Sequence, residues 1–264
     1  MKNKNKVAAF VVAVLAGFLT QGASGQGPAG LRINVGDASV NGVRVQPYTN
    51  QWTMTRTLPK GQVLEDAGTW NDELTVVTME GKDCLQRTQT AAFRGSDGET
   101  KATTRNVNVF DRKTFAPLLR IYEKHVAGGE DSKLTIRFGT KSMRIETVEN
   151  GKTETREAPT GAAFDFYGGV YAVLWAALPL KQGFSASYPS YAEGDHPETI
   201  SWVTMRVTGA EDVEAGPNKR VRAWVVESDT DIGKLKYWVS DAPPYIIRMD
   251  FKQPDGTAWL LKMS

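Results

Sequence analysis

From residue 30 onward, apolar and polar residues alternate along most of the chain with a period of two. This period is typical of antiparallel strands that turn one face to a core and the other to water. The segment 245–252 is the clearest case, and its predicted inner face carries Tyr245, Ile247, Met249 and Phe251. Turn residues 253–256 follow, and alternation resumes at 259–263, which predicts a C-terminal β-hairpin.

The same pattern predicts many further short strands. They are expected at 31–35, 38–46, 50–57, 73–80, 84–93, 101–110, 118–127, 134–138, 143–145, 153–156, 182–188, 198–208, 220–227 and 233–240. Asn150 and Gly151 predict a tight hairpin turn, and Gly139–Ser142, which superficially looks like the end of a phosphate loop, is better explained as another hairpin turn. The chain is therefore expected to be mainly β, as an antiparallel curved sheet or a half-open barrel.

One segment breaks the alternation, at about residues 169–178. It is apolar on every side, follows the pair Gly168-Gly169 and stops at Pro179, so it predicts a short helix that must be buried. A strongly apolar central strand is the alternative. In a β protein such a helix belongs inside a curved sheet or across a barrel mouth, either as a structural plug or as part of a ligand site. The candidate ligand-lining residues are Tyr171, Leu174, Trp175, Leu178, Tyr245, Ile247, Met249 and Trp259.

The first 25 residues have the pattern of a secretory signal peptide. Lys2, Lys4 and Lys6 precede the apolar run 7–19, and small residues stand before a plausible cleavage site at Gln26. An uncleaved N-terminal anchor is the alternative. Residues 26–264 are then expected to form one β-rich domain in the periplasm, without a lipid anchor because the sole cysteine, Cys84, lies far downstream. No second apolar run reaches the roughly 18 residues of a membrane-spanning helix, so no transmembrane segment is expected in the mature chain.

Charge and composition narrow the classes of partner. With Lys2, Lys4 and Lys6 removed from the 32 basic residues, 29 remain against 30 acidic residues, a net charge of −1. This balance argues against a nucleic-acid partner. Two histidines and one cysteine argue against a metal site, a cofactor or a disulfide, and Cys84 is expected to be a small buried residue. Seven tryptophans suit either a large core or an apolar cavity.

Catalytic motifs are absent from the sequence. No nucleophile elbow, zinc-protease pair, phosphate loop or dinucleotide fingerprint occurs. The most polar cluster, 193–198 with His196 at its centre, could hold an ion, although Gly194 and Pro197 are typical of a solvated loop. We therefore expect a non-catalytic protein, with a hydrolase of envelope material as a third hypothesis.

Several blocks in the second half of the chain carry a family resemblance. They are Val109–Arg120, Leu178–Phe184, Met205–Val213, Val221–Glu227 and Tyr237–Arg248. In this order they resemble a large group of exported bacterial proteins of unknown function, whose folds look similar to the periplasmic lipoprotein carrier and its outer-membrane receptor. The resemblance covers about residues 100–264. It implies an open or half-closed barrel whose concave face can hold acyl chains, and it assigns no binding residue.

Two functions follow as hypotheses. The first is an exported, non-catalytic protein that binds or carries a lipid or a lipoprotein acyl chain under the 169–178 helix. The alternative is a structural or assembly protein of the cell envelope, whose barrel is filled by its own side chains and whose surface binds another protein. An empty apolar cavity of several hundred Å³ would favour the carrier, and a filled interior would favour the alternative.

Overall fold

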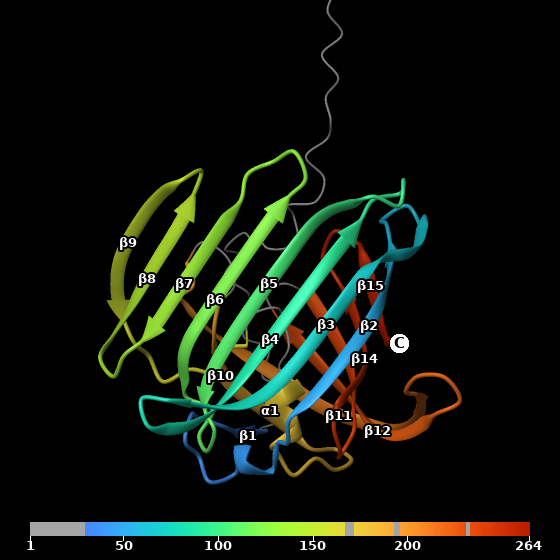
Figure 1. Ribbon diagram of the computed structural model, residues 1–264. Helices are drawn as coiled ribbons and strands as arrows, with labels where there is room; N and C mark the ends of the chain where they lie inside the picture. The colour runs from blue at the N-terminus through green and yellow to red at the C-terminus, as the bar shows by residue number, and fades with distance from the viewer. Residues whose placement is uncertain (1–29, 167–171, 193–195, 231–232) are drawn as a thin grey trace, which may run out of the picture.

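The computed structural model describes residues 30–166, 172–192, 196–230 and 233–264, and in this part of the chain one large β-sheet dominates (Figure 1). The sheet has 15 strands in the order β1-β10-β11-β12-β13-β14-β15-β2-β3-β4-β5-β6-β7-β8-β9. The strands are β1 (Leu31–Arg32), β2 (Tyr48–Thr57), β3 (Val63–Met79), β4 (Lys82–Arg94), β5 (Thr100–Asp111), β6 (Pro117–Val126), β7 (Ser132–Phe138), β8 (Ser142–Glu149), β9 (Lys152–Pro159), β10 (Ser185–Tyr191), β11 (Ile200–Glu214), β12 (Arg220–Thr230), β13 (Gly233–Val239), β14 (Ile246–Lys252) and β15 (Ala258–Met263). The expectation of a mainly β chain is confirmed.

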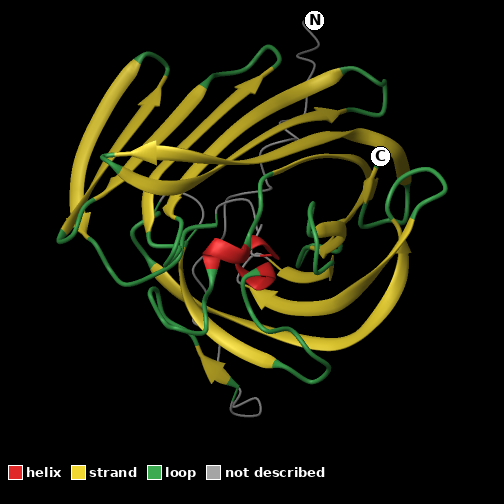
Figure 2. Cartoon of the chain, turned by 60° about the horizontal axis from the view of Figure 1, so that its bottom comes forward, coloured by secondary structure: helices red, strands yellow, loops and turns green. Residues whose placement is uncertain are grey.

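Two antiparallel meanders, β2–β9 and β10–β15, make up this sheet. The C-terminal strand β15 pairs with β2 and joins the two runs, while β1 pairs in parallel with β10. The edges are β1 and β9, and no ladder joins them among the described residues, so the sheet is not closed. In Figures 1 and 2 the strands β3–β9 form one layer, the strands β10–β14 lie behind it, and the short helix lies between them.

The helix α1 comprises Ala172–Ala176, which is shorter than the expected 169–178. Residues 169–171 lie outside the described part of the chain, and 177–178 continue the segment without helical backbone. Val173, Leu174 and Trp175 are all 0% exposed. They belong to one core cluster with side chains from both meanders, which explains why an all-apolar segment is tolerated here.

The strand predicted at 38–46 fails for a steric reason. The segment 38–46 contains a 3-10 helix at Gly42–Arg44 in place of a strand. A Cβ atom on Gly42 would lie 2.6 Å from the Phe115 ring and closer still to a backbone oxygen, so the chain packs here as a tight turn against the β5–β6 connection. The predicted strand 73–80 is present as the second half of β3, which begins ten residues earlier. Gly68, with φ of +148°, stands in its first half, where the pairing with β2 has an irregularity opposite Met54.

The expected turns are confirmed. Asn150 and Gly151 have φ of +52° and +72° between β8 and β9, as the Asn-Gly pair predicts. The Gly139 N–H donates to the Ser142 carbonyl over 3.0 Å and closes the β7–β8 turn. The C-terminal hairpin of β14 and β15 is also present.

The inner face predicted for 245–252 is wrong at Ile247. Tyr237 pairs with Met249 and Trp238 with Arg248, but Val239 pairs with Ile246, so Ile247 is an extra residue in β14. This bulge turns Ile247 away from Met249 and Phe251, and Ile246 joins their core cluster instead. Ile247 packs with Val225 and Trp238 in a separate cluster.

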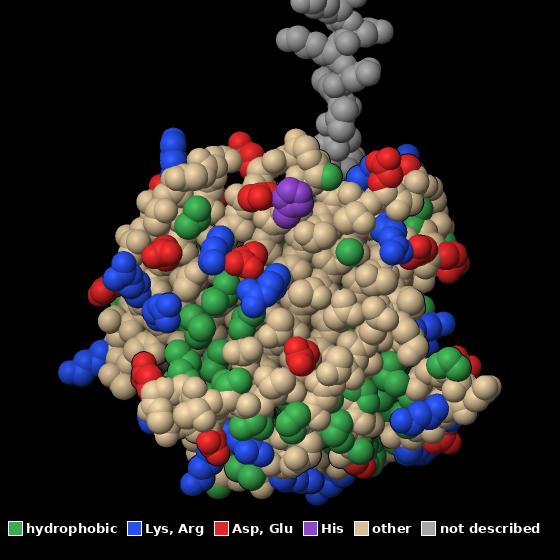
Figure 3. Space-filling view, in the orientation of Figure 1, with side chains coloured by type: hydrophobic (Ala, Val, Ile, Leu, Met, Phe, Trp, Pro, Cys, Tyr) green, Lys and Arg blue, Asp and Glu red, His purple; other side chains and the backbone are tan. Residues whose placement is uncertain are grey.

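The outer face of β3–β6 is apolar in one half, and hydrophobic side chains gather in the lower part of the face seen in Figure 3. Cys84, Val107 and Val109 form a small cluster there with partly buried Val77, Leu119 and Ile121. Cys84 is 0% exposed, as expected for a small buried residue, and burial raises the pKa of its thiol. Within the described residues, the structure contains no helix with the length and hydropathy needed to cross a membrane.

Candidate functional site

The candidate site lies on the inner face of the sheet around α1. Leu174, Trp175 and Leu178, three of the predicted ligand-lining residues, are buried there, whereas Tyr171 lies outside the described residues. The indole Nε1 of Trp175 donates to the Tyr188 hydroxyl over 2.9 Å. The indole and the Tyr237 ring also pack edge to face, with centroids 5.0 Å apart and planes at 89°. The helix is therefore fixed to β10 and β13 through one aromatic side chain.

Of the predicted residues near the C-terminal hairpin, the structure brings three into the same core cluster. Tyr245, Met249 and Trp259 are each 8% exposed or less and belong to the cluster that contains α1, whereas Ile247 does not. The Tyr245 hydroxyl accepts a hydrogen bond from the Gln46 backbone N–H over 2.8 Å. Tyr245 thus anchors the segment before β2 rather than facing open space.

A buried ion pair crosses β3 and β4 on this face. The Arg87 guanidinium donates through Nε and Nη2 to the two carboxylate oxygens of Asp72, each over 2.6 Å, and the Tyr48 hydroxyl donates to Asp72 over 2.7 Å. Arg87 is 1% and Asp72 0% exposed. Burial raises the pKa of Tyr48 well above its ordinary value, so the phenol stays protonated as a donor. Burial alone would lower the pKa of Arg87, but the Asp72 charge raises it, so the guanidinium stays charged.

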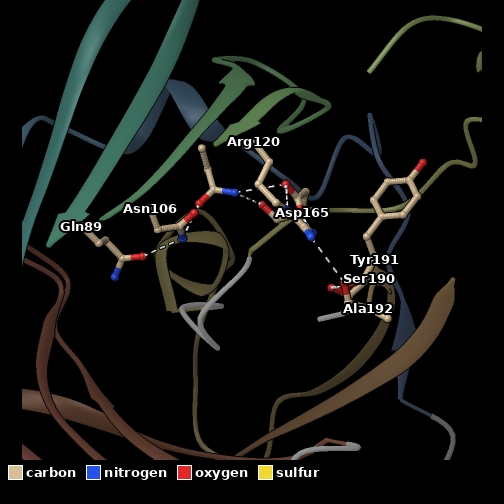
Figure 4. Close-up of polar contacts among 8 residues, drawn as sticks. Gln89, Asn106, Arg120, Asp165, Ser190, Tyr191 and Ala192 are labelled. Carbon is tan, nitrogen blue, oxygen red and sulfur yellow. Dashed lines mark hydrogen bonds and ion pairs between the residues drawn. The ribbon is translucent and has the colours of Figure 1, made fainter. Parts of the chain in front are cut away.

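A second buried ion pair ties β6 to the segment before α1 (Figure 4). Arg120 on β6 donates through Nε to Asp165 over 3.0 Å and through Nη2 to the other carboxylate oxygen. Asn108 on β5 donates to the same carboxylate over 3.1 Å, and Asn106 donates to Asn108 over 3.0 Å. The chain of contacts ends at Gln89 on β4, whose Oε1 accepts from Asn106 over 3.4 Å. Asp165 is thus held by two strands just before the described helix.

These polar residues were missed by the sequence analysis, although alternation contained the signal. Arg87 and Gln89 stand at the same parity as buried Leu85, and Asn106 and Asn108 at the same parity as buried Phe110. Polar residues at inward positions of several neighbouring strands predict a buried polar band. What alternation cannot supply is Asp165, because it lies in a loop distant in sequence.

Beside Gln89, the inner face encloses a small cavity of about 10 Å³. Four side chains with polar groups line it, Trp52, Trp70, Gln89 and Tyr237, and its other walls are Ile246, Met249 and Leu261. The nitrogens Trp52 Nε1, Trp70 Nε1 and Gln89 Nε2 are buried and make no hydrogen bond to the described residues. In Figure 4 the amide nitrogen of Gln89 points away from Asn106, which contacts the amide oxygen.

The polar loop around His196 is an ion-paired surface feature in its described part. Glu198 accepts from the Arg156 guanidinium on β9 over 2.7 Å, and His196 Nδ1 lies 3.3 Å from the other carboxylate oxygen of Glu198. Burial opposes ionisation of Glu198, but Arg156 lowers the pKa of that carboxyl below its ordinary value. In the described ranges no three His, Cys, Asp or Glu side chains gather in a way that could hold a metal ion. Residues 193–195 of this loop lie outside those ranges.

Comparison with known proteins gives one match. Neither the curated proteins nor the solved structures contain a significant match to this chain. Residues 51–261 match the family described as "Protein of unknown function (DUF3108)", a region that holds β3–β14 and most of β2 and β15 and begins well before the segment 100–264 on which the resemblance rested. Because the match covers most of the chain, the protein belongs to this family.

Proposed function

We propose that the protein is an exported, non-catalytic binding protein that holds an apolar ligand, a lipid or a lipoprotein acyl chain, on the inner face of its sheet. In this proposal the sheet is a half-open barrel in the periplasm, and α1 occupies the place that the ligand takes. The observation that carries the proposal is the character of α1. It is a five-residue helix, apolar on all its described sides, inserted among side chains of both meanders.

The physical basis of the proposal is the low cost of moving a short helix. A helix of five residues has few internal hydrogen bonds, and isolated helices of this length are unstable in water. Its described attachment to the sheet is dominated by apolar packing, with the Trp175–Tyr188 hydrogen bond as a polar contact. An acyl chain would make the same kind of apolar contacts with the walls of the site, because apolar contacts need no directional partner.

A second function is favoured by a different observation. The cavity beside Gln89 has a volume of about 10 Å³, far below that of a preformed lipid pocket. A more open hollow of about 510 Å³ is lined by residues that include Leu235, Phe251 and Trp259, so the alternative rests on the close packing beside Gln89. A filled interior is what the alternative requires, in which α1 is a permanent plug and the protein is a structural or assembly component of the envelope with a protein partner. Both functions use the same fold, and they differ in whether a ligand ever displaces α1.

Native mass spectrometry of protein purified from the periplasm tests the proposal, with organic extraction of any bound molecule. A co-purifying lipid supports the carrier. An apolar fluorescent dye, N-phenyl-1-naphthylamine, provides the second measurement. The carrier is expected to bind the dye as wild type, and Leu174→Gln should weaken binding more than it lowers stability. Binding that appears only in Trp175→Ala would identify a plug and favour the structural function.

A matched control separates a local effect from general destabilisation. Leu235→Gln places the same polar group on β13 at a position that is 3% exposed in the same cluster, but outside α1. Equal loss of dye binding in both variants, in proportion to their stability, would contradict a role of the helix in the ligand site.

A further inference from the structure

The cavity beside Gln89 differs from an ordinary packing defect in the chemistry of its walls. Empty cavities in proteins are usually apolar, and polar cavities usually contain water that satisfies the surrounding groups. Here the three unpartnered nitrogens come from three strands, Trp52 from β2, Trp70 from β3 and Gln89 from β4. Trp52 is 3% and Gln89 2% exposed, and Trp70 is a half-buried residue whose Nε1 atom is buried, so solvent does not reach the three nitrogens.

All three groups are donors. An indole N–H and an amide NH₂ can only donate, and the Gln89 oxygen already accepts from Asn106. A water molecule at this point would bring two hydrogens of its own, and the Tyr237 hydroxyl in the cavity wall could accept one of them, which leaves the other in competition with the three donor nitrogens. An oxygen that carries only lone pairs fits the donors better, and a volume of about 10 Å³ holds one such atom.

The remaining walls indicate what this oxygen is attached to. Ile246, Met249 and Leu261 form the apolar side of the cavity, and Met249 has a flexible side chain that can adapt to a neighbour. The neighbouring Arg87–Asp72 pair is internally neutralised, so it supplies no free charge that would require an ion. A neutral group that presents an oxygen acceptor at one end and continues as hydrocarbon matches the carbonyl end of an acyl group.

We infer that Trp52, Trp70 and Gln89 form a receptor for the carbonyl oxygen of an acyl ligand, whose hydrocarbon chain takes the place of α1 and packs along Ile246, Met249 and Leu261, because the cavity itself has room for the oxygen alone. This inference rests on the proposed function and defines its ligand class: acyl groups rather than apolar molecules in general. A free fatty acid and an acyl ester share this chemistry.

Two ligands of equal length provide the test, methyl decanoate and decyl methyl ether, measured by displacement of N-phenyl-1-naphthylamine. The ester has the carbonyl and the ether does not. Wild type is expected to bind the ester about tenfold more tightly than the ether, because the ether lacks the carbonyl oxygen that accepts from the buried donors. Gln89→Leu should remove that preference, whereas Gln86→Leu, a matched change on the other face of β4, should keep it.

A second measurement needs no substitution in the site. In the ¹H–¹⁵N spectrum of the wild-type protein, the indole signals of Trp52 and Trp70, assigned with the Phe variants, should move downfield with ester and not with ether. Decanoate distinguishes the two sources, since tighter binding of decanoate supports a free fatty acid and tighter binding of the ester supports an esterified group. Two results would overturn the inference and leave the proposed function standing. The first is equal affinity for ester and ether, and the second is a pair of indole signals that do not move when the ester binds. Binding of neither ligand nor dye would overturn both.

Discussion

Breaking the Arg120–Asp165 ion pair from one side should destabilise the protein strongly. Arg120 is 0% and Asp165 1% exposed, so neither charge can regain water when its partner is lost. Removal of one member of such a pair costs about 3–5 kcal/mol. For a domain of this size that corresponds to a fall in Tm of roughly 6–20 °C. Arg120→Met and Asp165→Asn should each show a loss in this range.

Replacing both partners should behave differently. In Arg120→Met/Asp165→Leu no uncompensated charge remains, and apolar replacement of a buried pair is often neutral or stabilising. We expect removal of the pair itself to change the stability by no more than about 2 kcal/mol. Asn108 then loses its acceptor, which adds about 1–3 kcal/mol unless its side chain rotates, so the double variant should lose at most about 5 kcal/mol. The two single losses together come to at least about 6 kcal/mol, so the expected coupling energy is at least about 1 kcal/mol.

Urea unfolding followed by tryptophan fluorescence measures these differences, with the slope of the transition checked for constancy. The control is Arg105–Glu123, an ion pair over 3.2 Å between β5 and β6 on the outer face, with side chains 48% and 36% exposed. Its loss should cost no more than about 1 kcal/mol. If the two inner single variants are no less stable than the outer ones, or if their effects simply add, the conclusion that Arg120 and Asp165 neutralise each other in the interior is refuted.

Three further perturbations follow from the structure. Gly42→Ala should cost about 1–3 kcal/mol by overpacking against Phe115, while Gly209→Ala, which has open space around its Cβ position, should be close to neutral in the same urea titration. Cys84 should react with a thiol reagent only after unfolding, because burial hides it and raises the pKa of its thiol; fast labelling of the native protein would contradict this. Burial alone would raise the pKa of Asp111, but hydrogen bonds from Thr114 and Lys113 lower it below 3.8, so Asp111 stabilises the fold above about pH 4 and loses this contribution as the pH falls through its folded pKa. Unfolding midpoints of wild type and Asp111→Asn should therefore converge on acidification, and a constant gap from pH 7 to pH 3 would contradict the assignment.

The sheet was predictable because its physical cause is local. Strands such as 245–252 and 84–93 alternate in the sequence, and the turns at Asn150-Gly151 and Gly139 carry residues suited to their backbone. Errors arose where backbone sterics overrode the pattern. The bulge at Ile247 shifts the side chains by one position without any local sequence signal, and Gly42 places a turn where alternation predicted a strand.

The candidate site was predictable only in its apolar half. A helix that is apolar all round must be buried, and Leu174 and Trp175 are indeed buried. The polar half depends on which strands become neighbours. Asp72 meets Arg87 and Asp165 meets Arg120 only once the register of β3–β6 is set, and the second pair spans 45 positions of the sequence.

The buried polar groups of the inner face fall into two kinds, and the difference bears on function. Asp72 with Arg87, and Asp165 with Arg120, have their hydrogen-bonding capacity met by each other and by adjacent side chains, as stability alone would require. Trp52, Trp70 and Gln89 lie in the same interior with unmet donors. Each donor without a partner costs about 1–3 kcal/mol, so the cost of all three is large compared with a total stability of about 5–15 kcal/mol. Phe or Leu at these positions would carry no such cost. Stability alone therefore does not account for them, and the inferred acyl carbonyl would complete hydrogen bonds that in most proteins a buried water molecule completes.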